Sequence, residues 1–592
     1  MKIMENEKLL KEFPPVRTAD WQAAIAHELK SSDFEKKLIW HTEEGMAVKP
    51  FYRAEDLEGL ACVDKAPGDF PYRRGARPAG DWRVREEIDG VDAEEANRLA
   101  RAAVAAGTEG IAFSEILVEG PGELEKLLTG LDAVPLHFEQ ADERFLRMVI
   151  EWLSGTPRAA EISTGCDALA AIEFAAEIVR DAPSGFVPFT IHGEAFAEAG
   201  ATAVEEIGFA LAACVDFLAT AVERGVDVSR AAAALEFAFA VGSNYFFEIA
   251  KLRAFRMVWA RAVESFGGSR EAARARIAAR TSRWNKTIYD PHVNILRATT
   301  EAMAAVVGGA DAVAVAPFDA CYKAPAEASR RLARNTQLVL KHEAWLGRVA
   351  DAGGGSYALE TITDFLAGEG WGTMQEIEAG GGFSKAQAQG TIAQKLERAR
   401  AACGQAVAIR KRVLVGTNQF ANPDEEALDR IDTQRIKADV RGASVYEEMR
   451  LRTERHAAAG GKTPRVLLAE IGDPKMRAAR SNFAGNFFAC AGFEVTTRRF
   501  KKAAEIADAD AEVIVLCSAD AEYMNLAAEL MPELKALGRT TPVIAAGNPE
   551  NAEELRAAGI ADFVHLRSHP VEFLTKWQER LGIEERLLAS SC

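Results

Sequence analysis

Residues 465–471, Arg-Val-Leu-Leu-Ala-Glu-Ile, begin the part of the chain whose fold the sequence determines most clearly. Two more apolar runs follow, Glu512–Cys517 and Pro542–Ala546, and helical patterns separate them. Continuous apolar runs of this length are typical of strands buried on both faces of a parallel sheet. With Phe493–Thr497 and Asp562–Leu566 they form five strand–helix units, which predict a flavodoxin-like doubly wound domain. A ligand of such a domain lies at the carboxyl ends of its strands.

Upstream of this domain, short strand-like runs alternate with long amphipathic helices between about residues 80 and 320. Eight strands separated by helices over this length fit a (β/α)8 barrel better than an open sheet. Residues 321–410 have a helical pattern almost throughout, and we expect them to pack against the barrel or extend its last crossover. The predicted barrel strands are Trp82–Ile88, Gly110–Glu115, Ala133–Glu139, Ala159–Ser163, Phe186–His192, Leu235–Val241, Arg276–Ser282 and Ala312–Pro317.

Two stretches have weaker patterns. Residues 421–463 are charged and poor in strand signals, which predicts an interdomain linker with some helix. Its Gly-Gly-Lys-Thr run does not match a phosphate-binding loop, because His456 stands where that motif needs glycine. Residues 1–45 lack the pattern of a self-sufficient core. The predicted divisions are an N-terminal arm (1–45), the barrel with its helical extension (46–420), the linker (421–463) and the doubly wound domain (464–592).

The formal net charge of −17 is spread along the chain, and an acidic surface repels nucleic-acid backbones. No apolar run reaches the roughly 18 to 20 residues that a membrane span needs. The first residues mix acids and bases without an apolar signal core. We therefore expect a cytoplasmic protein that binds neither nucleic acid nor membrane. The eight cysteines form no CxxC pair and no cluster with histidine at zinc spacing, so we predict no metal site.

Several long motifs carry a family resemblance. They are Asp69-Phe-Pro-Tyr-Arg-Arg-Gly75, Trp82-Arg-Val-Arg85, Glu198-Ala-Gly-Ala-Thr202, the stretch from Asn244 to Trp259, Ala333-Arg-Asn-Thr-Gln337 and the stretch from Gly372 to Glu378. From about residue 45 to the end, the chain resembles the cobalamin-dependent acyl-CoA mutases of the methylmalonyl-CoA mutase type. The resemblance implies a barrel followed by a flavodoxin-like, cobalamin-binding-type domain. The reaction that it implies is the interconversion of methylmalonyl-CoA and succinyl-CoA.

The resemblance fails at the cobalamin-binding motif. Catalytic chains of the family carry Asp-x-His-x-x-Gly after the first strand of the second domain, where the histidine coordinates cobalt and the aspartate orients it. Here the same window, residues 472–480, reads Gly-Asp-Pro-Lys-Met-Arg-Ala-Ala-Arg. Loops whose glycines would let the backbone approach the cofactor tail are replaced by Ser518–Glu522 and by Ala545-Ala546-Gly547. We expect that this domain keeps the fold and lacks the ligand.

The barrel also departs from the catalytic pattern that the resemblance implies. Ala195 stands where the family's Gly-Tyr-His motif has its histidine, and Glu194 would place negative charge near an anionic substrate. His192 lies three residues earlier, and strand alternation does not place it equivalently. The loop 76–81 lacks the tyrosine that shields the radical in the family. Ala234 replaces the arginine expected to bind the substrate carboxylate.

These departures predict a non-catalytic small subunit. The family contains such chains, which have both domains and pair with a catalytic large subunit. The resemblance therefore implies a heterodimer whose adenosylcobalamin is held by the partner and not by this chain. We predict no catalytic, cofactor-binding or metal-binding residue here, and a role in assembly and stability of the large subunit.

Two alternatives remain open. A catalytic mutase with a rearranged site predicts that the isolated chain binds cobalamin. A non-catalytic acyl-CoA-binding module predicts saturable binding of CoA esters. The basic residues that could serve the second alternative are Arg73, Arg74, Arg77, Arg83 and Arg85, with the basic helical faces at residues 250–259 and 331–337.

Overall fold

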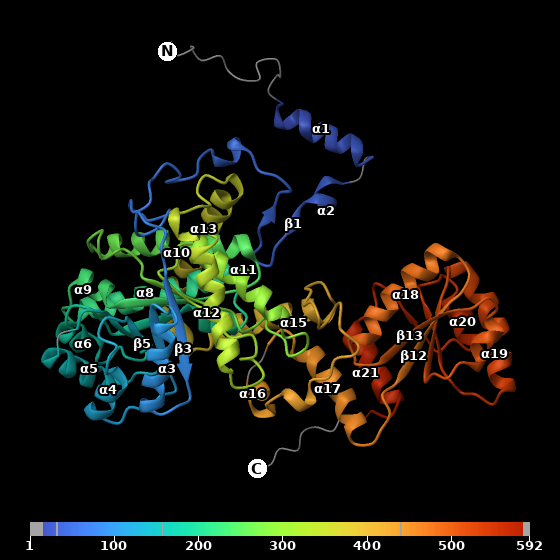
Figure 1. Cartoon of the computed structure of the whole chain (residues 1–592). Coiled ribbons are helices and arrows are strands. Elements are labelled where there is room, and N and C mark those ends of the chain that lie inside the picture. Colours follow the sequence, from blue (N-terminus) through green and yellow to red (C-terminus); the bar gives the residue numbers. More distant parts are fainter. Residues whose placement is uncertain (1–15, 31–32, 157, 439–440, 584–592) are drawn as a thin grey trace, which may run out of the picture.

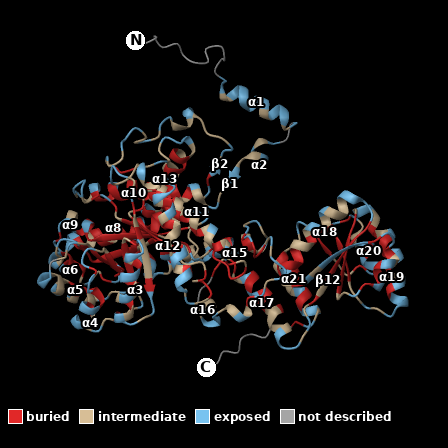
Figure 2. Ribbon diagram, in the orientation of Figure 1, coloured by how far each residue is buried: buried red, intermediate tan, exposed pale blue. Residues whose placement is uncertain are grey.

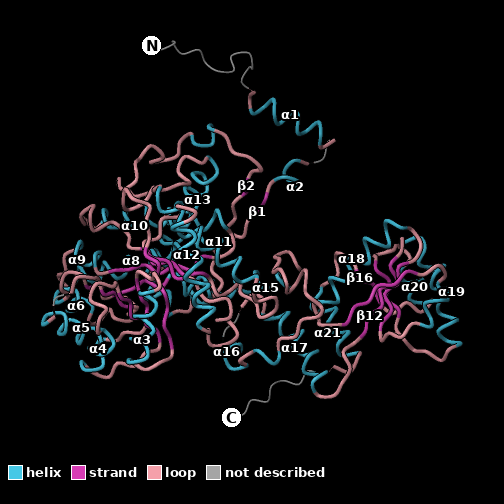
Figure 3. Tube along the Cα trace, viewed as in Figure 1, coloured by secondary structure: helices cyan, strands magenta, loops and turns pink. Residues whose placement is uncertain are grey.

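The computed structural model describes residues 16–30, 33–156, 158–438 and 441–583 of the chain. The chain forms a parallel barrel and a smaller sheet domain, which lie at opposite ends of the molecule and are joined by helices (Figure 1). Figure 3 shows the strands of each unit gathered at its centre and the helices around them. Among the described residues, no helix is both long enough and apolar enough to cross a membrane.

The barrel closes through an interrupted strand. Its strands are hydrogen-bonded in the order β7-β6-β5-β4-β3-β11-β10-β9-β8, and β7 and β8 are consecutive parts of one strand separated by Pro188. The sheet is thus a closed (β/α)8 barrel, and all eight predicted strands are confirmed. The strands are β3 (Arg83–Asp89), β4 (Gly110–Ser114), β5 (Leu136–Phe138), β6 (Ile162–Thr164), β7 (Phe186–Val187), β8 (Phe189–His192), β9 (Leu235–Val241), β10 (Ile277–Thr281) and β11 (Ala312–Ala314).

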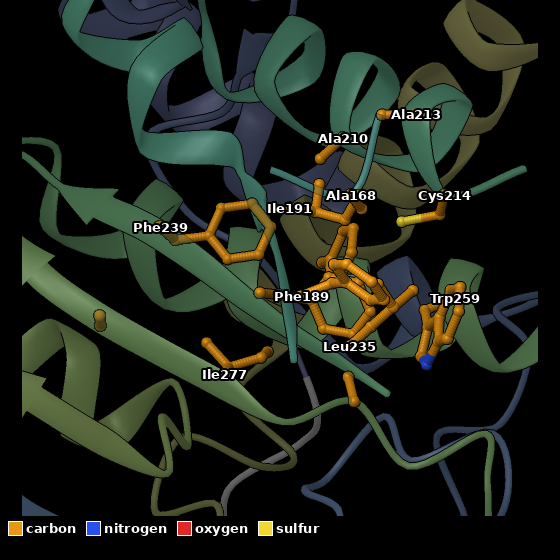
Figure 4. Packing of buried hydrophobic residues seen from close by; sticks show 14 of the residues in the cluster. Ala168, Phe189, Ile191, Ala210, Ala213, Cys214, Leu235, Phe239, Trp259 and Ile277 are labelled. Carbon is orange, nitrogen blue, oxygen red and sulfur yellow. The ribbon is translucent and has the colours of Figure 1, made fainter. Parts of the chain in front are cut away.

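Helices cover the outside of the barrel. The outward side chains of β8 and β9, such as Phe189 and Phe239, pack under α8 and α10 (Figure 4). Burial of such apolar surface contributes roughly 25 cal/mol per Å². Thr202 and Glu205 form a capping box that starts α8. The helices are α3 (Ala93–Ala105), α4 (Pro121–Leu128), α5 (Glu143–Gly155), α6 (Ala175–Asp181), α7 (Gly193–Glu198), α8 (Ala203–Glu223), α9 (Val228–Ala233), α10 (Tyr245–Ser265) and α11 (Val293–Val307).

The helical extension after the barrel packs against it, as the sequence predicts. The longest helix, α13, lies against α8 and α10. This approach needs glycine at 208, because a Cβ there would lie 2.5 Å from the side chain of Thr373 on α13. The elements of the extension are α12 (Glu327–His342), η2 (Leu346–Arg348), α13 (Tyr357–Ala379), α14 (Phe383–Ala388) and α15 (Thr391–Ala408).

The N-terminal arm projects from the barrel (Figures 1 and 2). Neither of its helices has a buried residue. Residues 1–15 and 31–32 of the predicted arm lie outside the described residues. The elements here are α1 (Thr18–Glu28), α2 (Phe34–Leu38), the antiparallel pair β1 (Trp40–His41) and β2 (Ala47–Val48), and η1 (Ala54–Leu57).

The stretch predicted as a linker is helical and packed. Tyr446 and Met449 of its longest helix are buried, and Arg441 forms a buried ion pair of 2.8 Å with Glu447. Gln578 donates a hydrogen bond to the carbonyl of Met449, which ties this helix to the last helix of the C-terminal domain. The elements of the stretch are η3 (Leu428–Arg430), α16 (Thr433–Ala438) and α17 (Ser444–Ala458).

The C-terminal domain has the predicted flavodoxin-like topology. Its five parallel strands follow the order β13-β12-β14-β15-β16. The predicted second helix is only a 3-10 turn, η4, and the side chains of the edge strand β13 are largely exposed. The elements are β12 (Arg465–Glu470), α18 (Pro474–Ala489), β13 (Glu494–Arg499), η4 (Ala503–Asp508), β14 (Val513–Cys517), η5 (Asp520–Glu522), α19 (Tyr523–Ala536), β15 (Val543–Ala546), α20 (Ala552–Ala557), β16 (Asp562–Val564) and α21 (Pro570–Arg580).

Candidate functional site

The lumen of the barrel is the first place where a ligand could lie. On β9, Leu235, Phe237 and Phe239 pack into the apolar core outside the barrel, so the alternating residues Glu236 and Ala238 face inward. Branched aliphatic side chains usually fill such a lumen in layers. Here the inward positions of the strands carry charged residues and small ones. The small residues include Gly110, Ala112, Ala238, Ala240, Ala278 and Ala312.

Charged side chains meet across the lumen. Arg85 of β3 lies 3.3 Å from Glu236 of β9, and His137 Nδ1 of β5 lies 3.3 Å from the same carboxylate. These strands are not neighbours in the sheet, so the contacts cross the interior. Burial alone would raise the pKa of Glu236, but the charges of Arg85 and His137 lower it to about 2. Burial lowers the pKa of His137. The centre of the barrel is therefore a paired, charged cluster.

A second cluster lies toward the carboxyl ends of the strands. Arg280 of β10 pairs with Glu139 at 2.5 Å and lies 3.8 Å from Glu87. His192 Nδ1 lies 2.8 Å from Glu194, and its Nε2 lies 2.9 Å from the carbonyl of Gly165. Burial would lower the pKa of His192, but the hydrogen bond to Glu194 and its charge raise it to about 9. His192 is therefore held by the first turn of α7 and by the loop that follows β6.

The positions at which the chain departs from the catalytic pattern do not all lie at the carboxyl end of the barrel strands. Ala195 lies in α7, directly after β8, at the carboxyl face where barrel enzymes have their active sites. The loop 76–81 precedes β3, and Ala234 precedes β9, so both lie at the opposite, amino end. At these positions the chain offers neither a guanidinium group nor a phenol group. Neither position supports a conclusion about activity.

The five arginines that could have served a CoA ester all have carboxylate partners within the chain. The shortest of these contacts is 2.6 Å, between Arg73 and Glu360, and both side chains are fully buried. These carboxylates offset the positive charge of the guanidinium groups, which weakens their attraction for ligand phosphates. The five pairs are Arg73–Glu360, Arg74–Glu360, Arg77–Asp311, Arg83–Glu161 and Arg85–Glu236.

The basic faces at residues 250–259 and 331–337 are also largely paired. On α10, Arg253 forms ion pairs with Asp351 and Glu360, and Lys251 pairs with Glu206 at 2.6 Å. On α12, Arg334 pairs with Glu86 at 2.7 Å. The charges of these residues are thus balanced within the chain.

The carboxyl edge of the C-terminal sheet is the second place where a ligand could lie. Asp473 caps α18 by accepting hydrogen bonds from the backbone N–H groups of Lys475 and Met476. Arg480, two turns into this helix, pairs with Asp520 at 2.9 Å and donates to the carbonyl of Ala546. It thereby crosses the ends of β12, β14 and β15. A Cβ added at residue 547, next to Ala546, would collide with the Arg480 guanidinium.

Glu522 fills the other half of this edge. Its carboxylate accepts hydrogen bonds from Ser518 Oγ and from the backbone N–H groups of Asp473 and Ala519. The hydrogen bond from Ser518 is the main reason that the pKa of Glu522 is lowered. A Cβ at Gly472 would collide with the same carboxylate. The backbone approach that a cofactor tail would need is thus taken by side chains of this chain.

The side chains at this edge do not fit the cobalamin of the related catalytic chains. The window 472–480 holds no imidazole. His565 follows β16, which lies three strands from β12, and its Nδ1 accepts a hydrogen bond from the backbone of Arg567. His569 caps α21. Among the described residues, no group of three or more His, Cys, Asp or Glu side chains could hold a metal ion.

A closed (β/α)8 barrel followed by a flavodoxin-like domain is the architecture of the cobalamin-dependent acyl-CoA mutases. The family model for methylmalonyl-CoA mutase matches residues 41–115 and 166–483 of this chain. The chain belongs to the methylmalonyl-CoA mutase family, and this family is cobalamin-dependent. The resemblance predicted from the sequence motifs is confirmed.

Two relatives that match over nearly their full length are small subunits of methylmalonyl-CoA mutase. The methylmalonyl-CoA mutase small subunit of Porphyromonas gingivalis is 35% identical over 98% of this chain and 99% of that protein. The small subunit of Streptomyces virginiae is 32% identical over 97% and 98% of the two chains. The methylmalonyl-CoA mutase of Rhizobium meliloti is 31% identical, over 74% of this chain and 68% of its own length.

Proposed function

We propose that this chain is the non-catalytic small subunit of a heterodimeric methylmalonyl-CoA mutase, which interconverts methylmalonyl-CoA and succinyl-CoA. The observation that carries the proposal is that both places where a mutase would hold its ligands are filled by side chains of the chain itself. In the barrel, Arg85, His137 and Glu236 meet across the lumen. In the C-terminal domain, Arg480 and Glu522 occupy the carboxyl edge of the sheet.

The charge of the barrel opening argues against a substrate site. Methylmalonyl-CoA is an anion at its acyl end and at its phosphates. Glu87, Glu139 and Glu194 face the region where the acyl group would lie, and Arg280 and His192 are already paired with them. Introducing an anion there would separate these pairs and leave buried carboxylates uncompensated, which costs several kcal/mol. Ala195 offers no hydrogen bond to a thioester carbonyl.

The adenosylcobalamin of the holoenzyme is, in this proposal, bound by the large subunit. The small subunit has no histidine in the cobalt-binding window and no free path for the nucleotide tail past Arg480 and Glu522. When bound to the partner, the cofactor supplies the radical chemistry of the isomerisation. The residues described here take no part in those steps.

The surface around the N-terminal arm is suited to a protein partner. Trp40, Phe246 and Tyr357 are 52%, 58% and 41% exposed, and they line a groove of about 390 Å³ between the arm and α13. Exposed aromatic side chains gathered in a groove are typical of protein interfaces. The arm itself contributes α1, which has no buried residue. We propose that the large subunit covers this surface and is stabilised by it.

Co-production with a catalytic large subunit tests the proposal. We expect a 1:1 complex by size-exclusion chromatography with light scattering, mutase activity in the complex, and no activity of this chain alone. The large subunit alone should be less stable to heat. A large subunit that is soluble, fully active and equally stable without this chain would contradict the proposed role. Mutase activity of the isolated chain would favour the alternative of a divergent catalytic mutase.

The alternative of an acyl-CoA-binding module has its own test. It requires saturable binding of a CoA ester to the isolated chain. The pairing of all five candidate arginines with carboxylates argues against it, because these carboxylates offset the positive charge that would attract a phosphate. Calorimetric titration with succinyl-CoA should therefore show no saturable heat.

A further inference from the structure

The edge strand β13 of the C-terminal sheet (Figure 1) is open on the side away from β12. Among the described strands it is hydrogen-bonded to β12 alone. Five of its six residues are exposed, and the sixth, Val495, is half-buried. The sheet therefore ends in an exposed strand whose free lateral edge can pair with another strand.

The backbone of β13 shows which groups lie along this free edge. Glu494 N–H donates to the carbonyl of Pro464, and Phe500 N–H donates to the carbonyl of Glu470. In a parallel pair, alternate residues make the hydrogen bonds to one neighbour, so the residues between these two direct every second N–H and C=O away from β12. The outward-directed residues of β13 are Val495, Thr497 and Arg499.

A basic cluster continues from the end of this edge. Residues 498–502 include Arg498, Arg499, Lys501 and Lys502, all exposed, in a chain whose formal net charge is −17. Arg499 pairs with Glu470 at 2.9 Å, and the other three form no ion pair with a described residue. The local charge is therefore opposite in sign to that of the whole chain.

The contacts of the cluster leave its cations facing solvent. The Arg498 guanidinium lies 5.2 Å from the centre of the Phe500 ring, which holds this charge beside the strand. Glu505, the carboxylate next along the chain, accepts a hydrogen bond from the backbone N–H of Lys501. Four cations thus stand against two carboxylates, Glu470 and Glu505, and the cluster keeps a net positive charge.

An extended acidic polypeptide complements both features. Its backbone can pair with the free N–H and C=O groups of β13, and its carboxylates can pair with the cations. A second copy of β13 would place like charges opposite one another, which disfavours self-pairing. A nucleic acid offers no strand to the edge and is repelled by the net charge of the chain. We propose that the free edge of β13 binds an extended acidic segment of a partner protein by strand addition. The proposal does not depend on the proposed subunit role.

Fluorescence anisotropy of a labelled octapeptide that alternates glutamate with threonine tests this proposal on the full chain. We expect saturable binding at low ionic strength with a dissociation constant of about 0.1 mM or below. Binding should weaken at least about tenfold in about 0.5 M sodium chloride, because the cations are exposed. Absence of binding at low ionic strength would overturn the proposal.

Two further peptides and an oligonucleotide separate charge from strand pairing. The octapeptide with lysine in place of glutamate should not bind, and equal binding of it would overturn the assignment of an acidic partner. The octapeptide with proline in place of threonine keeps the charge but lacks half of the N–H donors, so we expect much weaker binding. Equal binding of the proline peptide would overturn strand addition. Tighter binding of single-stranded oligothymidylate than of the acidic peptide would overturn the assignment of a protein partner.

A double substitution locates the binding. Lys501→Glu with Lys502→Glu reverses two exposed charges, and we expect it to weaken peptide binding at least about tenfold. The matched control is Lys462→Glu with Lys535→Glu, which changes the net charge equally at two exposed positions near the amino ends of the strands. The control should weaken binding less than about threefold. An equal loss in the two double variants would show that overall charge and not this edge determines binding, which would also overturn the proposal.

Discussion

The barrel lumen and the carboxyl edge of the C-terminal sheet are both filled from within, but in different ways. The lumen holds ion pairs between strands that are not neighbours, and Glu236 at its centre is 1% exposed. At the sheet edge, Arg480 and Glu522 extend from helices and reach over the strand ends. Asp520, which pairs with Arg480, is 46% exposed.

The two sets of side chains therefore contribute differently to the stability of the fold. Charges buried in a lumen are stable only as a complete set, because loss of one member leaves another unpaired in a medium of low dielectric constant. At the sheet edge the Arg480 side chain is 15% exposed and its partner Asp520 is 46% exposed, so water can replace this ion pair at smaller cost. The lumen cluster is therefore part of what holds the barrel together, whereas the edge contacts close a surface that would fold without them.

The largest effect is expected in the lumen. Glu236→Gln removes the charge that faces Arg85 and His137, so we expect it to lower the free energy of unfolding by about 3 kcal/mol or more. Urea denaturation followed by circular dichroism measures this. As a control, Glu264→Gln breaks an exposed pair with Arg261 and should change stability by less than about 0.5 kcal/mol. A loss below about 1 kcal/mol at Glu236 would remove the contrast between the two regions.

A smaller, pH-dependent effect is expected at the barrel opening. The folded-state pKa of His192, about 9, lies above the ordinary value of 6.5, so the imidazolium stabilises the fold fully below pH 6.5. This contribution is lost as the pH rises through about 9. His192→Asn should therefore cost about 2 kcal/mol more at pH 6 than above about pH 10.

Denaturation curves at several pH values measure this dependence. The matched control is His342→Asn, at an exposed position near the end of α12, which should have no such dependence. A cost for His192→Asn that is the same at both ends of the pH range would mean that the His192–Glu194 contact is not an ion pair.

In the C-terminal domain, the N-cap of α18 should affect stability and not ligand binding. Asp473 lies in the window where the family carries its cobalamin motif, and here it caps α18. Asp473→Ala should cost about 1 kcal/mol of stability, the usual loss for an N-cap. Thermal unfolding compared with Asp508→Ala, at the end of η4, measures it. No loss of stability at Asp473 would mean that its two backbone contacts do not hold the helix start.

The smallest effect is expected at the sheet edge itself. Arg480→Ala removes the contacts with Asp520 and Ala546, and we expect a change of only about 0.5 kcal/mol. The same urea denaturation measures it beside Glu236→Gln. A loss of stability equal to that of Glu236→Gln would show that the side chains at the sheet edge stabilise the fold as much as those in the lumen. The proposed difference between the two regions would then be wrong.

Much of the fold could be predicted from the sequence, because its patterns are local. Apolar runs such as Val513–Cys517 are buried on both faces, and three of the five strands of the C-terminal domain are evident from such runs. The eight barrel strands were predictable for the same reason, even where the structure shortens them. The second helix of the C-terminal domain was not, since Ala503–Asp508 has a helical composition but forms only a 3-10 turn.

The site was less predictable, because pairing across a lumen is not visible in one sequence. Arg85 could be read as a phosphate ligand until its partner Glu236, on a distant strand, was known. The absence of an imidazole from residues 472–480 was evident from the sequence. The positions of the Arg480 and Glu522 side chains over the strand ends were not. The alternation of Glu236 with Leu235 and Phe237 was the one signal that could have indicated a charged lumen.

The most direct test of the central claim is equilibrium binding of adenosylcobalamin to the purified chain, followed by the visible spectrum of the cofactor. The account predicts no binding by the unaltered chain and none by the Arg480→Ala variant, because opening the sheet edge does not supply the missing imidazole. Stoichiometric binding by the unaltered chain, with the spectrum of cobalamin whose own base has left cobalt, would contradict it. The chain would then hold the cofactor itself, and its role as a non-catalytic subunit would have to be abandoned.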